Sequence, residues 1–185
     1  LVCNGGAYTV DSTISVITPA NDNVVQTVEV GYNPKEMTVD KNGDIWVICY
    51  GYVKYDSNFQ IVLERPSKLV KLSGPSFQKT EFVISKTMHP QHLGISSDKS
   101  TVYYGGGFGF AGIYAMGITD NTLPATPIIG TKMFYGFNVN PANGEIFALD
   151  ATDYTGPGIL YRYSAQGNLI KQYSTGVAPN GVAFK

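Results

Sequence analysis

The sequence carries little charge and lacks the features by which a chain commonly binds nucleic acid or crosses a membrane. Charged residues make up 15% of the 185 positions, and the formal net charge is −1. No basic surface is therefore expected to hold a phosphate backbone. No apolar run approaches the roughly 20 residues of a bilayer-spanning helix. We expect neither a nucleic-acid partner nor a membrane-spanning segment, and the low charge content favours an extracytoplasmic location, at a cell surface or in the periplasm.

Cysteine is also scarce. The two cysteines, Cys3 and Cys49, are too few for a disulfide framework. The segments LVCNGG and WVICYG place them at matching positions of neighbouring repeats. Packed sheets lie about 10 Å apart, whereas a disulfide needs Cα atoms within roughly 7 Å, so we predict two free, buried thiols. The chain opens on Leu1 with no visible signal peptide, which indicates a mature segment or a piece of something longer.

A four-fold repeat of short apolar segments dominates the chain. Its anchors begin at residues 12, 67, 111 and 158, which are 55, 44 and 47 residues apart, and read STISVIT, SKLVKLS, AGIYAMG and GILYRYS. Repeats of this length with four strands each are typical of β-propeller blades. We predict an all-β fold, a β-propeller of four-stranded antiparallel blades, with about four blades in this chain and no helix longer than two turns.

The predicted blades lie near 1–31, 32–85, 86–130 and 131–175, followed by a closing strand in 176–185. The outermost strand of the third blade is expected at 124–130, and the Asn-Gly pairs at 42–43 and 143–144 are expected to form type I′ turns. This frame starts in a second strand and ends in a first strand. Either the ends meet in a ring of four blades, or further blades or a second chain complete a larger, seven-bladed ring; we favour the larger ring.

Two segments resemble repeats of a known family. NPKEMTVDKNGDIWVICYG (33–51) and STISVITPANDNVVQTVEVG (12–31) are similar to the YVTN-type β-propeller repeat family, which has NHL-like relatives. The resemblance implies a surface-layer-like or periplasmic binding propeller, with a corrinoid-type molecule among the ligands to consider. More distant relatives are lyases and lactonases. The repeat transfers no catalytic residue, and the single Trp46 departs from the repeated tryptophans of quinone-dependent propellers.

Ligands of propellers bind where loops converge at one end of the ring, and here those loops are rich in aromatic residues. The insertion 50–67 lengthens its blade by about ten residues, and it can be read either as part of a binding surface or as an extra hairpin packed on the blade rim. Tyr8 lies on a neighbouring loop. The predicted ligand-binding residues are Tyr50, Tyr52, Tyr55, Phe59, Arg65, His89, Phe108, Phe110, Phe134, Tyr135, Asp153 and Tyr154.

Two functions remain open. The first is a non-catalytic module that binds a small molecule or a protein through these loops. The second is a lyase or lactonase that uses His89 and loop carboxylates as acid and base. His89 and His92 are three residues apart, and alternation along a strand makes a shared metal improbable. No serine triad, P-loop or dinucleotide fingerprint is present, so we expect no cofactor and no metal.

Overall fold

The protein is built from β-strands. The computed structural model describes residues 1–6 and 10–185, with Thr131 by its backbone only, and this part of the chain contains antiparallel sheets and no helix. The predicted all-β class is therefore confirmed. The chain divides into two compact units, residues 1–37 with 43–89 and residues 38–42 with 90–185, which we describe separately.

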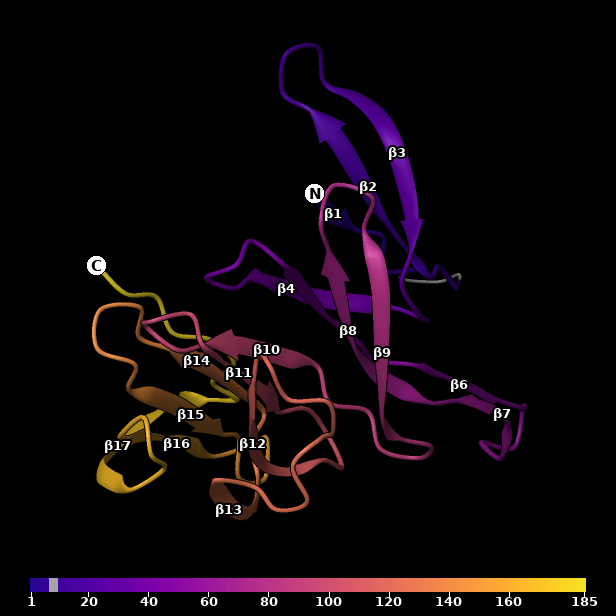
Figure 1. Ribbon diagram of the computed structural model, residues 1–185. Coiled ribbons are helices and arrows are strands. Elements are labelled where there is room, and N and C mark those ends of the chain that lie inside the picture. Colours follow the sequence, from indigo (N-terminus) through magenta and orange to yellow (C-terminus); the bar gives the residue numbers. More distant parts are fainter. Residues whose placement is uncertain (7–9) are drawn as a thin grey trace. The chain divides into compact units, whose positions relative to one another are not determined.

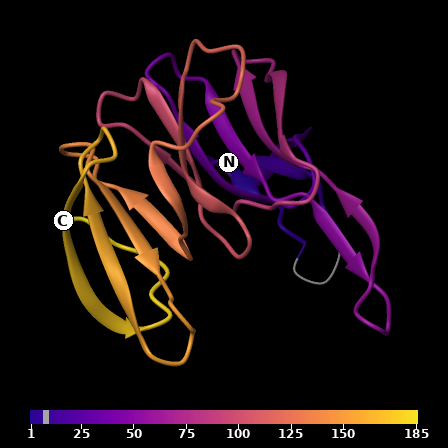
Figure 2. The ribbon, with the colours of Figure 1, turned by 90° about the horizontal axis from the view of Figure 1, so that it is seen from below.

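The first unit contains β1 to β3, most of β4, and β5 to β9 (Figure 1). One sheet has three strands in the order β1 (Val2–Cys3), β2 (Thr13–Thr18) and β3 (Asn23–Glu29). A second sheet has four, in the order β4 (Pro34–Val39), β5 (Ile45–Cys49), β8 (Ser67–Ser73) and β9 (Gln78–Ser85). The insertion between β5 and β8 forms a separate hairpin of β6 (Tyr52–Tyr55) and β7 (Ile61–Arg65), which extends beyond its parent sheet in Figure 2.

The second unit contains two four-stranded meanders. The first runs β10 (His92–Ile95), β11 (Thr101–Gly105), β12 (Ala111–Gly117) and β13 (Ile129–Met133). The second runs β14 (Gly136–Val139), β15 (Ile146–Asp150), β16 (Pro157–Tyr163) and β17 (Leu169–Val177). Within each sheet every strand pairs with the strands that precede and follow it, and β10 lies against β14. Sequential four-stranded meanders are the arrangement expected of propeller blades.

Apolar residues from adjacent sheets form a core in each unit. In β5 the four residues from Trp46 to Cys49 are all buried, which shows that this strand is covered on both faces. The core of the first unit contains Ile14, Val30, Val47, Cys49, Val70 and Leu72. The core of the second unit contains Tyr103, Ile113, Ile129, Phe134, Phe137, Ile146, Ala148 and Tyr161. The strands therefore bury their side chains between sheets, not within a single sheet.

The Asn-Gly turns differ from the predicted type. Gly43 and Gly144 have positive φ angles of 84° and 75°, but Asn42 and Asn143 are not among the residues with positive φ. A type I′ turn needs positive φ at both central positions. Instead, the Asp40 side chain accepts a hydrogen bond from the Asn42 amide at 2.8 Å, an Asx turn that leaves one left-handed position for glycine.

Two predicted strands are also corrected. The outermost strand of the third sheet spans Ile129–Met133 instead of 124–130, because Pro124 and Pro127 cannot donate ladder hydrogen bonds. The predicted closing strand in 176–185 is not formed, because its first two residues belong to β17, which ends at Val177, and the segment 178–185 is irregular. Its contacts are a hydrogen bond from the Val182 amide to Asn138 Oδ1 and a ring contact between Phe184 and Phe147. Neither contact is a ladder bond, so no strand is assigned.

Both cysteines are free thiols in the structure. Cys49 belongs to the core of the first unit, and Cys3 packs against that core. Burial, with a smaller contribution from Cys3, raises the pKa of the Cys49 thiol to about 12, and burial also raises the pKa of Cys3. The prediction of buried thiols is correct for Cys49 and wrong for Cys3, which is only partly buried. Since the thiolate is the reactive form, Cys49 is the better protected of the two in the folded protein.

Replacing Phe137 by Ala should destabilise the second unit strongly. The ring is almost fully buried in the core, and its loss leaves a cavity that costs about 3–5 kcal/mol in the free energy of unfolding. The matched control is Leu169→Ala on the exposed side of β17, which should change stability by no more than about 0.5 kcal/mol. Urea unfolding followed by far-ultraviolet circular dichroism measures both. Similar midpoints for the two variants would contradict this core assignment.

Thiol labelling tests the cysteine environment. A pH of 8 is far below the pKa of about 12 of the Cys49 thiol, so this thiol is protonated in the folded protein. A disulfide reagent should therefore modify it far more slowly in the native protein than after unfolding. Cys3, which is partly exposed, should react faster than Cys49. Protein unfolded without reductant should titrate two thiols. A count of zero would show that the two cysteines are joined.

Candidate functional site

The twelve predicted ligand-binding residues fall into two groups. Six lie in the first unit, on the β5–β8 insertion and the loop that follows β9, and six lie in the second unit, on loops at the ends of its sheets. Each group is described within its own unit. That the two groups together line one face remains a prediction, and Tyr8 lies outside the described residues.

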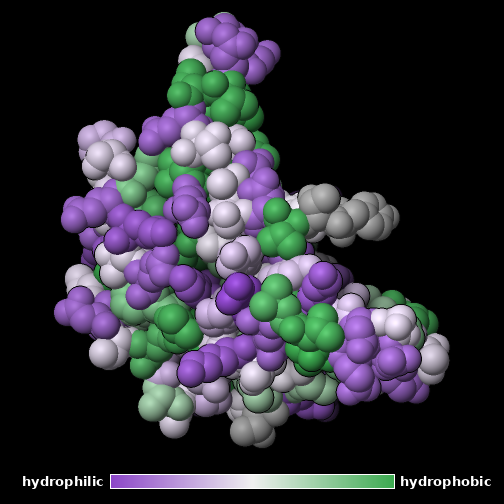
Figure 3. Space-filling view, turned by 90° about the vertical axis from the view of Figure 1, so that its right-hand side faces the viewer, coloured by the Kyte–Doolittle hydropathy of each residue, from purple (hydrophilic) through white to green (hydrophobic). Residues whose placement is uncertain are grey.

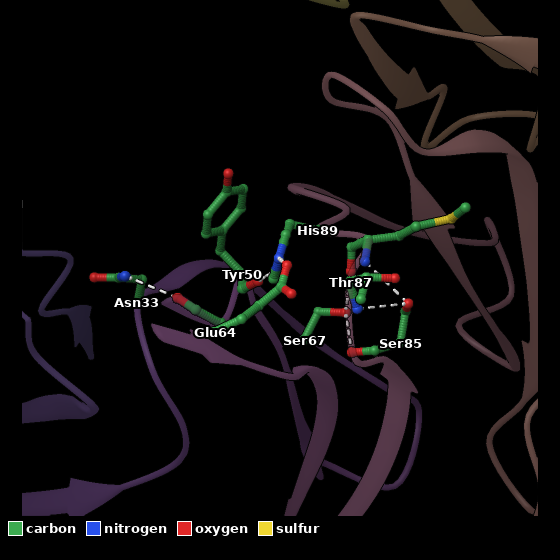
Figure 4. Close-up of polar contacts among 9 residues, drawn as sticks. Asn33, Tyr50, Glu64, Ser67, Ser85, Thr87 and His89 are labelled. Atoms are coloured by element: carbon green, nitrogen blue, oxygen red, sulfur yellow. Dashed lines mark hydrogen bonds and ion pairs between the residues drawn. The ribbon is translucent and has the colours of Figure 1, made fainter. Parts of the chain in front are cut away.

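In the first unit, His89 is held between two oxygen atoms. Its Nδ1 lies 2.6 Å from the main-chain oxygen of Tyr50, and its Nε2 lies 3.1 Å from Oε1 of Glu64, as Figure 4 shows. The Tyr50 ring packs on the imidazole with centroids 4.8 Å apart. Only 7% of His89 is exposed, and burial raises the pKa of Tyr50. His89 therefore joins the loop after β9 to the base of the β6–β7 hairpin.

The chemistry of these contacts leaves His89 no unused ring nitrogen. A carbonyl oxygen only accepts hydrogen bonds, so Nδ1 carries a hydrogen and donates it to Tyr50. The contact between Nε2 and Glu64 is a hydrogen bond when one proton lies between them, on the imidazole or on the carboxyl group. A general acid or base must reach its substrate through a free nitrogen. In this structure both nitrogens bind protein atoms, so the arrangement is one that positions loops.

Neighbouring backbone contacts strengthen the same junction. The Asn33 side-chain amide donates to the Gly51 carbonyl at 2.8 Å, and the Gly51 amide donates to the Tyr32 carbonyl at 2.9 Å. Gly51 has a φ of 88°, and a Cβ there would collide with the Arg65 carbonyl oxygen. Only glycine fits this close approach. On the other side of His89, Ser67 Oγ donates to the Met88 carbonyl at 2.7 Å (Figure 4).

The hairpin itself presents its apolar side chains to solvent. Phe59, at the turn, is 85% exposed, and Tyr55 is also exposed, while Tyr52 near the base is partly buried. Arg65 is exposed at the end of β7. The insertion is thus a hairpin, one of the two interpretations drawn from the sequence, but its tip aromatics do not pack on a sheet.

In the second unit, three loops enclose a hollow. Its lining comes from the turn after β11, the end of β13 with the β13–β14 junction, and the segment after β15. The hollow holds about 300 Å³ of empty space, part of it open to solvent. We call it the aromatic hollow, and it is lined by Gly107, Phe108, Met133, Phe134, Tyr135, Asp150, Ala151, Thr152 and Tyr154.

Backbone hydrogen bonds hold these loops together. The Gly107 amide donates to the Phe134 carbonyl at 2.9 Å, and the Tyr135 amide donates to the Leu149 carbonyl at 2.7 Å. Thr152 and Tyr154 have positive φ angles of 54° and 62°, a left-handed conformation that is uncommon outside glycine. The walls of the hollow are therefore set by main-chain contacts and not only by side-chain packing.

The aromatic rings of the hollow differ in exposure. Phe134 is buried and forms its base, with its ring edge-on to Tyr161 at 6.0 Å. Phe108 is 76% exposed, and Tyr154 is 43% exposed. The rings of Tyr135 and Tyr154 lie 5.2 Å apart with their planes at 84°. Exposed rings on rigidly held loops are suited to binding a ligand.

The charged groups at the rim of the hollow are Asp150, which lines it, and Lys132, which pairs with Asp150. Asp150 Oδ2 lies 2.9 Å from Nζ of Lys132, and Asp150 Oδ1 accepts a hydrogen bond from the Thr152 amide at 2.8 Å. The Lys132 ammonium also lies 5.3 Å from the centre of the Tyr161 ring. The hydrogen bond to Asp150, aided by Tyr161, raises the pKa of Lys132.

Two of the predicted ligand-binding residues, Phe110 and Asp153, bind or pack against other parts of the protein and do not line the hollow. Phe110 is 5% exposed and packs against Tyr104 and Tyr114, so its ring faces the interior. Asp153 accepts hydrogen bonds from the amides of Gly156 and Thr155, which lower the pKa of its carboxyl group. Asp153 thus stabilises the turn that carries Tyr154.

Met133 and Lys132 were missed by the sequence reasoning. The predicted strand at 124–130 placed both of them in a loop, whereas β13 extends to Met133. Alternation along the strand separates the two side chains onto opposite faces, so no local pattern placed them at the hollow: Met133 lines it, and Lys132 reaches it through its ion pair with Asp150.

Among solved structures, the chain is similar to large proteins of different activities. It resembles hydrazine synthase of Kuenenia stuttgartiensis with a TM-score of 0.69 and 14% identity, over 89% of this chain and 44% of that one. It resembles a gluconolactonase of Xanthomonas campestris with a TM-score of 0.54 and 20% identity, over 80% and 49%. It also resembles a quinoprotein alcohol dehydrogenase-like protein of Bacteroides thetaiotaomicron with a TM-score of 0.56 and 15% identity, over 82% and 36%.

These likenesses concern the fold alone and support a propeller-like arrangement of the sheets. The chain spans less than half the length of each of these structures. No protein-family model matches the chain, and no relative was found among curated proteins. Within the described residues, no helix is long and apolar enough to cross a membrane.

Replacing His89 by Ala should destabilise the first unit. The change leaves the Tyr50 carbonyl and the Glu64 carboxylate without their partner, which costs about 1–3 kcal/mol in the free energy of unfolding. Met88→Ala, which removes an exposed side chain in the same loop, is the control and should stay within about 0.5 kcal/mol of the wild type. Denaturant unfolding measures both. An unchanged stability of the His89 variant would refute the positioning role.

Proposed function

We propose that the protein is a non-catalytic binding propeller of the YVTN type that acts outside the cytoplasm, at a bacterial cell surface or in the periplasm. It captures a small ligand in the aromatic hollow. The observation that carries this proposal is the group of exposed rings, Phe108 and Tyr154 above all, around a hollow whose loops are held by main-chain hydrogen bonds. Preformed concave sites lined by aromatic side chains with a few polar groups are typical ligand sites.

The composition agrees with this location. A chain with 15% charged residues and a net charge of −1 has little to attract nucleic acid, and the resemblance of its repeats to surface-layer-like and periplasmic propellers supports an extracytoplasmic role. The corrinoid-type ligand considered from the resemblance is one candidate for the occupant.

We further propose that the blades of this chain belong to a larger ring, completed by additional blades or by a second chain. The solved structures it resembles are more than twice as long as the part it matches. The sheet β1-β2-β3 has three strands where the other large sheets have four. Its β3 strand exposes Val24 and Val25, and Figure 3 shows hydrophobic side chains along this hairpin below its hydrophilic tip. Val24 and Val25 are consecutive residues of β3, and exposed apolar side chains of this kind on a protruding hairpin favour a neighbour.

A lactonase-type enzyme is the second candidate, because His89 contacts the carboxylate of Glu64 at 3.1 Å. A paired imidazole and carboxylate is one of the arrangements that supply a general base. The burial of His89 and the hydrogen bond of its other nitrogen to Tyr50 weigh against this role. Hydrolysis of glucono-1,5-lactone, followed by acid release, separates the candidates. Acceleration by the wild type that is lost in His89→Ala would favour the enzyme.

The binding proposal predicts that Phe108→Ala and Tyr154→Ala weaken capture of small molecules without loss of stability. Exposed aromatic residues contribute mainly to binding, so dissociation constants should rise about tenfold. Saturation-transfer NMR with a set of water-soluble fragments, including indole and cyclohexanol, with cyanocobalamin as a full-size probe, provides the measurement. Phe59→Ala, an exposed aromatic of the first unit, is the control. If no probe binds, or if the Phe59 change weakens binding as much, the hollow is not the site.

A further inference from the structure

The rings of the aromatic hollow form a corner. The planes of Tyr135 and Tyr154 meet at 84° with centroids 5.2 Å apart, and the exposed ring of Phe108 belongs to the same lining. In this edge-to-face pair the edge of one ring meets the face of the other, and the two planes bound a right-angled space beside the contact. The face of an aromatic ring carries negative charge density, so a cation in such a corner is attracted by more than one ring.

The polar groups of the rim restrict which cation suits this corner. Both oxygens of Asp150 already accept a hydrogen bond or an ion pair, from Thr152 and from Lys132. A primary ammonium ion would have to give up hydrogen bonds to water, and this carboxylate offers few free positions in exchange. A quaternary ammonium ion has no N–H group to satisfy. Its methyl groups also suit the exposed thioether of Met133, which lies in the lining.

The charge balance of the rim points to the rings as the source of attraction. Lys132 and Asp150 form an ion pair with no net charge, and Lys132 is held away over the Tyr161 ring. The pair therefore offers no uncompensated negative charge to a cationic ligand. Cation–π attraction contributes about 0.5–1 kcal/mol at exposed sites and about 2 kcal/mol when the site is desolvated, and several rings act together.

We propose that the ligand of the aromatic hollow is a small soluble quaternary ammonium compound, held by the ring faces of Phe108, Tyr135 and Tyr154. This inference rests on the proposed function, because it assigns a ligand class to the same hollow. It adds a chemical criterion: the positive charge of the ligand, and not its apolar shape alone, determines binding.

Choline and 3,3-dimethylbutan-1-ol test this criterion directly. The two molecules have the same shape, but a neutral carbon replaces the charged nitrogen in the alcohol. Isothermal titration calorimetry and NMR titration of the folded protein should show choline binding about tenfold more tightly than the alcohol, the difference expected from roughly 1.4 kcal/mol of cation–π attraction.

Variants assign the binding to the rings. Tyr154→Phe keeps the ring and should retain choline binding within about twofold, whereas Tyr154→Leu and Phe108→Leu remove ring faces and should weaken it about fivefold or more. Phe59→Leu makes the same change at an exposed ring of the first unit and should leave choline binding unaltered. Circular dichroism confirms that each variant is folded, so a loss of binding reports on the hollow.

Four outcomes overturn the inference. Equal binding of choline and the alcohol, weakened alike by Phe108→Leu, would show an apolar site without charge selectivity and would leave the proposed function intact. Binding of the fragments indole or cyclohexanol without binding of choline would have the same meaning. Binding to phosphatidylcholine vesicles without binding of free choline would replace the soluble ligand by a lipid head group. If fragments, choline and alcohol all fail to bind in the hollow, the proposed function falls as well.

Discussion

The structure depends on one constraint, namely that a β-sheet with two apolar faces must be covered on both of them. Strand β5 buries four consecutive residues from Trp46 to Cys49, and β11 buries four from Val102 to Gly105. Strands of this kind are stable only between neighbouring sheets. Within each unit, adjacent sheets meet over one continuous core, and the positions of the strand ends follow from that packing.

The strand ends in turn determine where side chains are presented to solvent. In the second unit, the amide of Gly107 and the amide of Tyr135 bind carbonyl oxygens of neighbouring strands or loops, so the segments that carry the rings are held by the same framework as the core. The aromatic hollow is therefore preformed, which lowers the entropy lost when a ligand binds. In the first unit the same principle gives a different result, because His89 uses both nitrogens to join two loops and leaves the aromatic tip of the β6–β7 hairpin exposed.

The contrast between His89 and Phe108 shows how far sequence reasoning reaches for the site. Both were predicted to contact a ligand, because both lie in loops between repeats. Phe108 is exposed in the hollow, while His89 is buried between Tyr50 and Glu64. Loop position follows from the repeat, but exposure depends on which groups the fold brings alongside. The same holds for Phe110, whose ring turns inward toward Tyr104 two residues after an exposed phenylalanine.

The sequence by itself determined the all-β class, the four-stranded repeat and the positions of most strands, because alternating apolar residues, prolines and glycines act locally. It placed most of the other strands well and failed at 124–130 and at the closing strand in 176–185, where pairing depends on distant partners. Only the tertiary structure decided that Lys132 pairs with Asp150, that Tyr135 stands perpendicular to Tyr154, and that Met133 joins the hollow. These contacts join residues from separate strands and loops, and no local pattern encodes the distance between them.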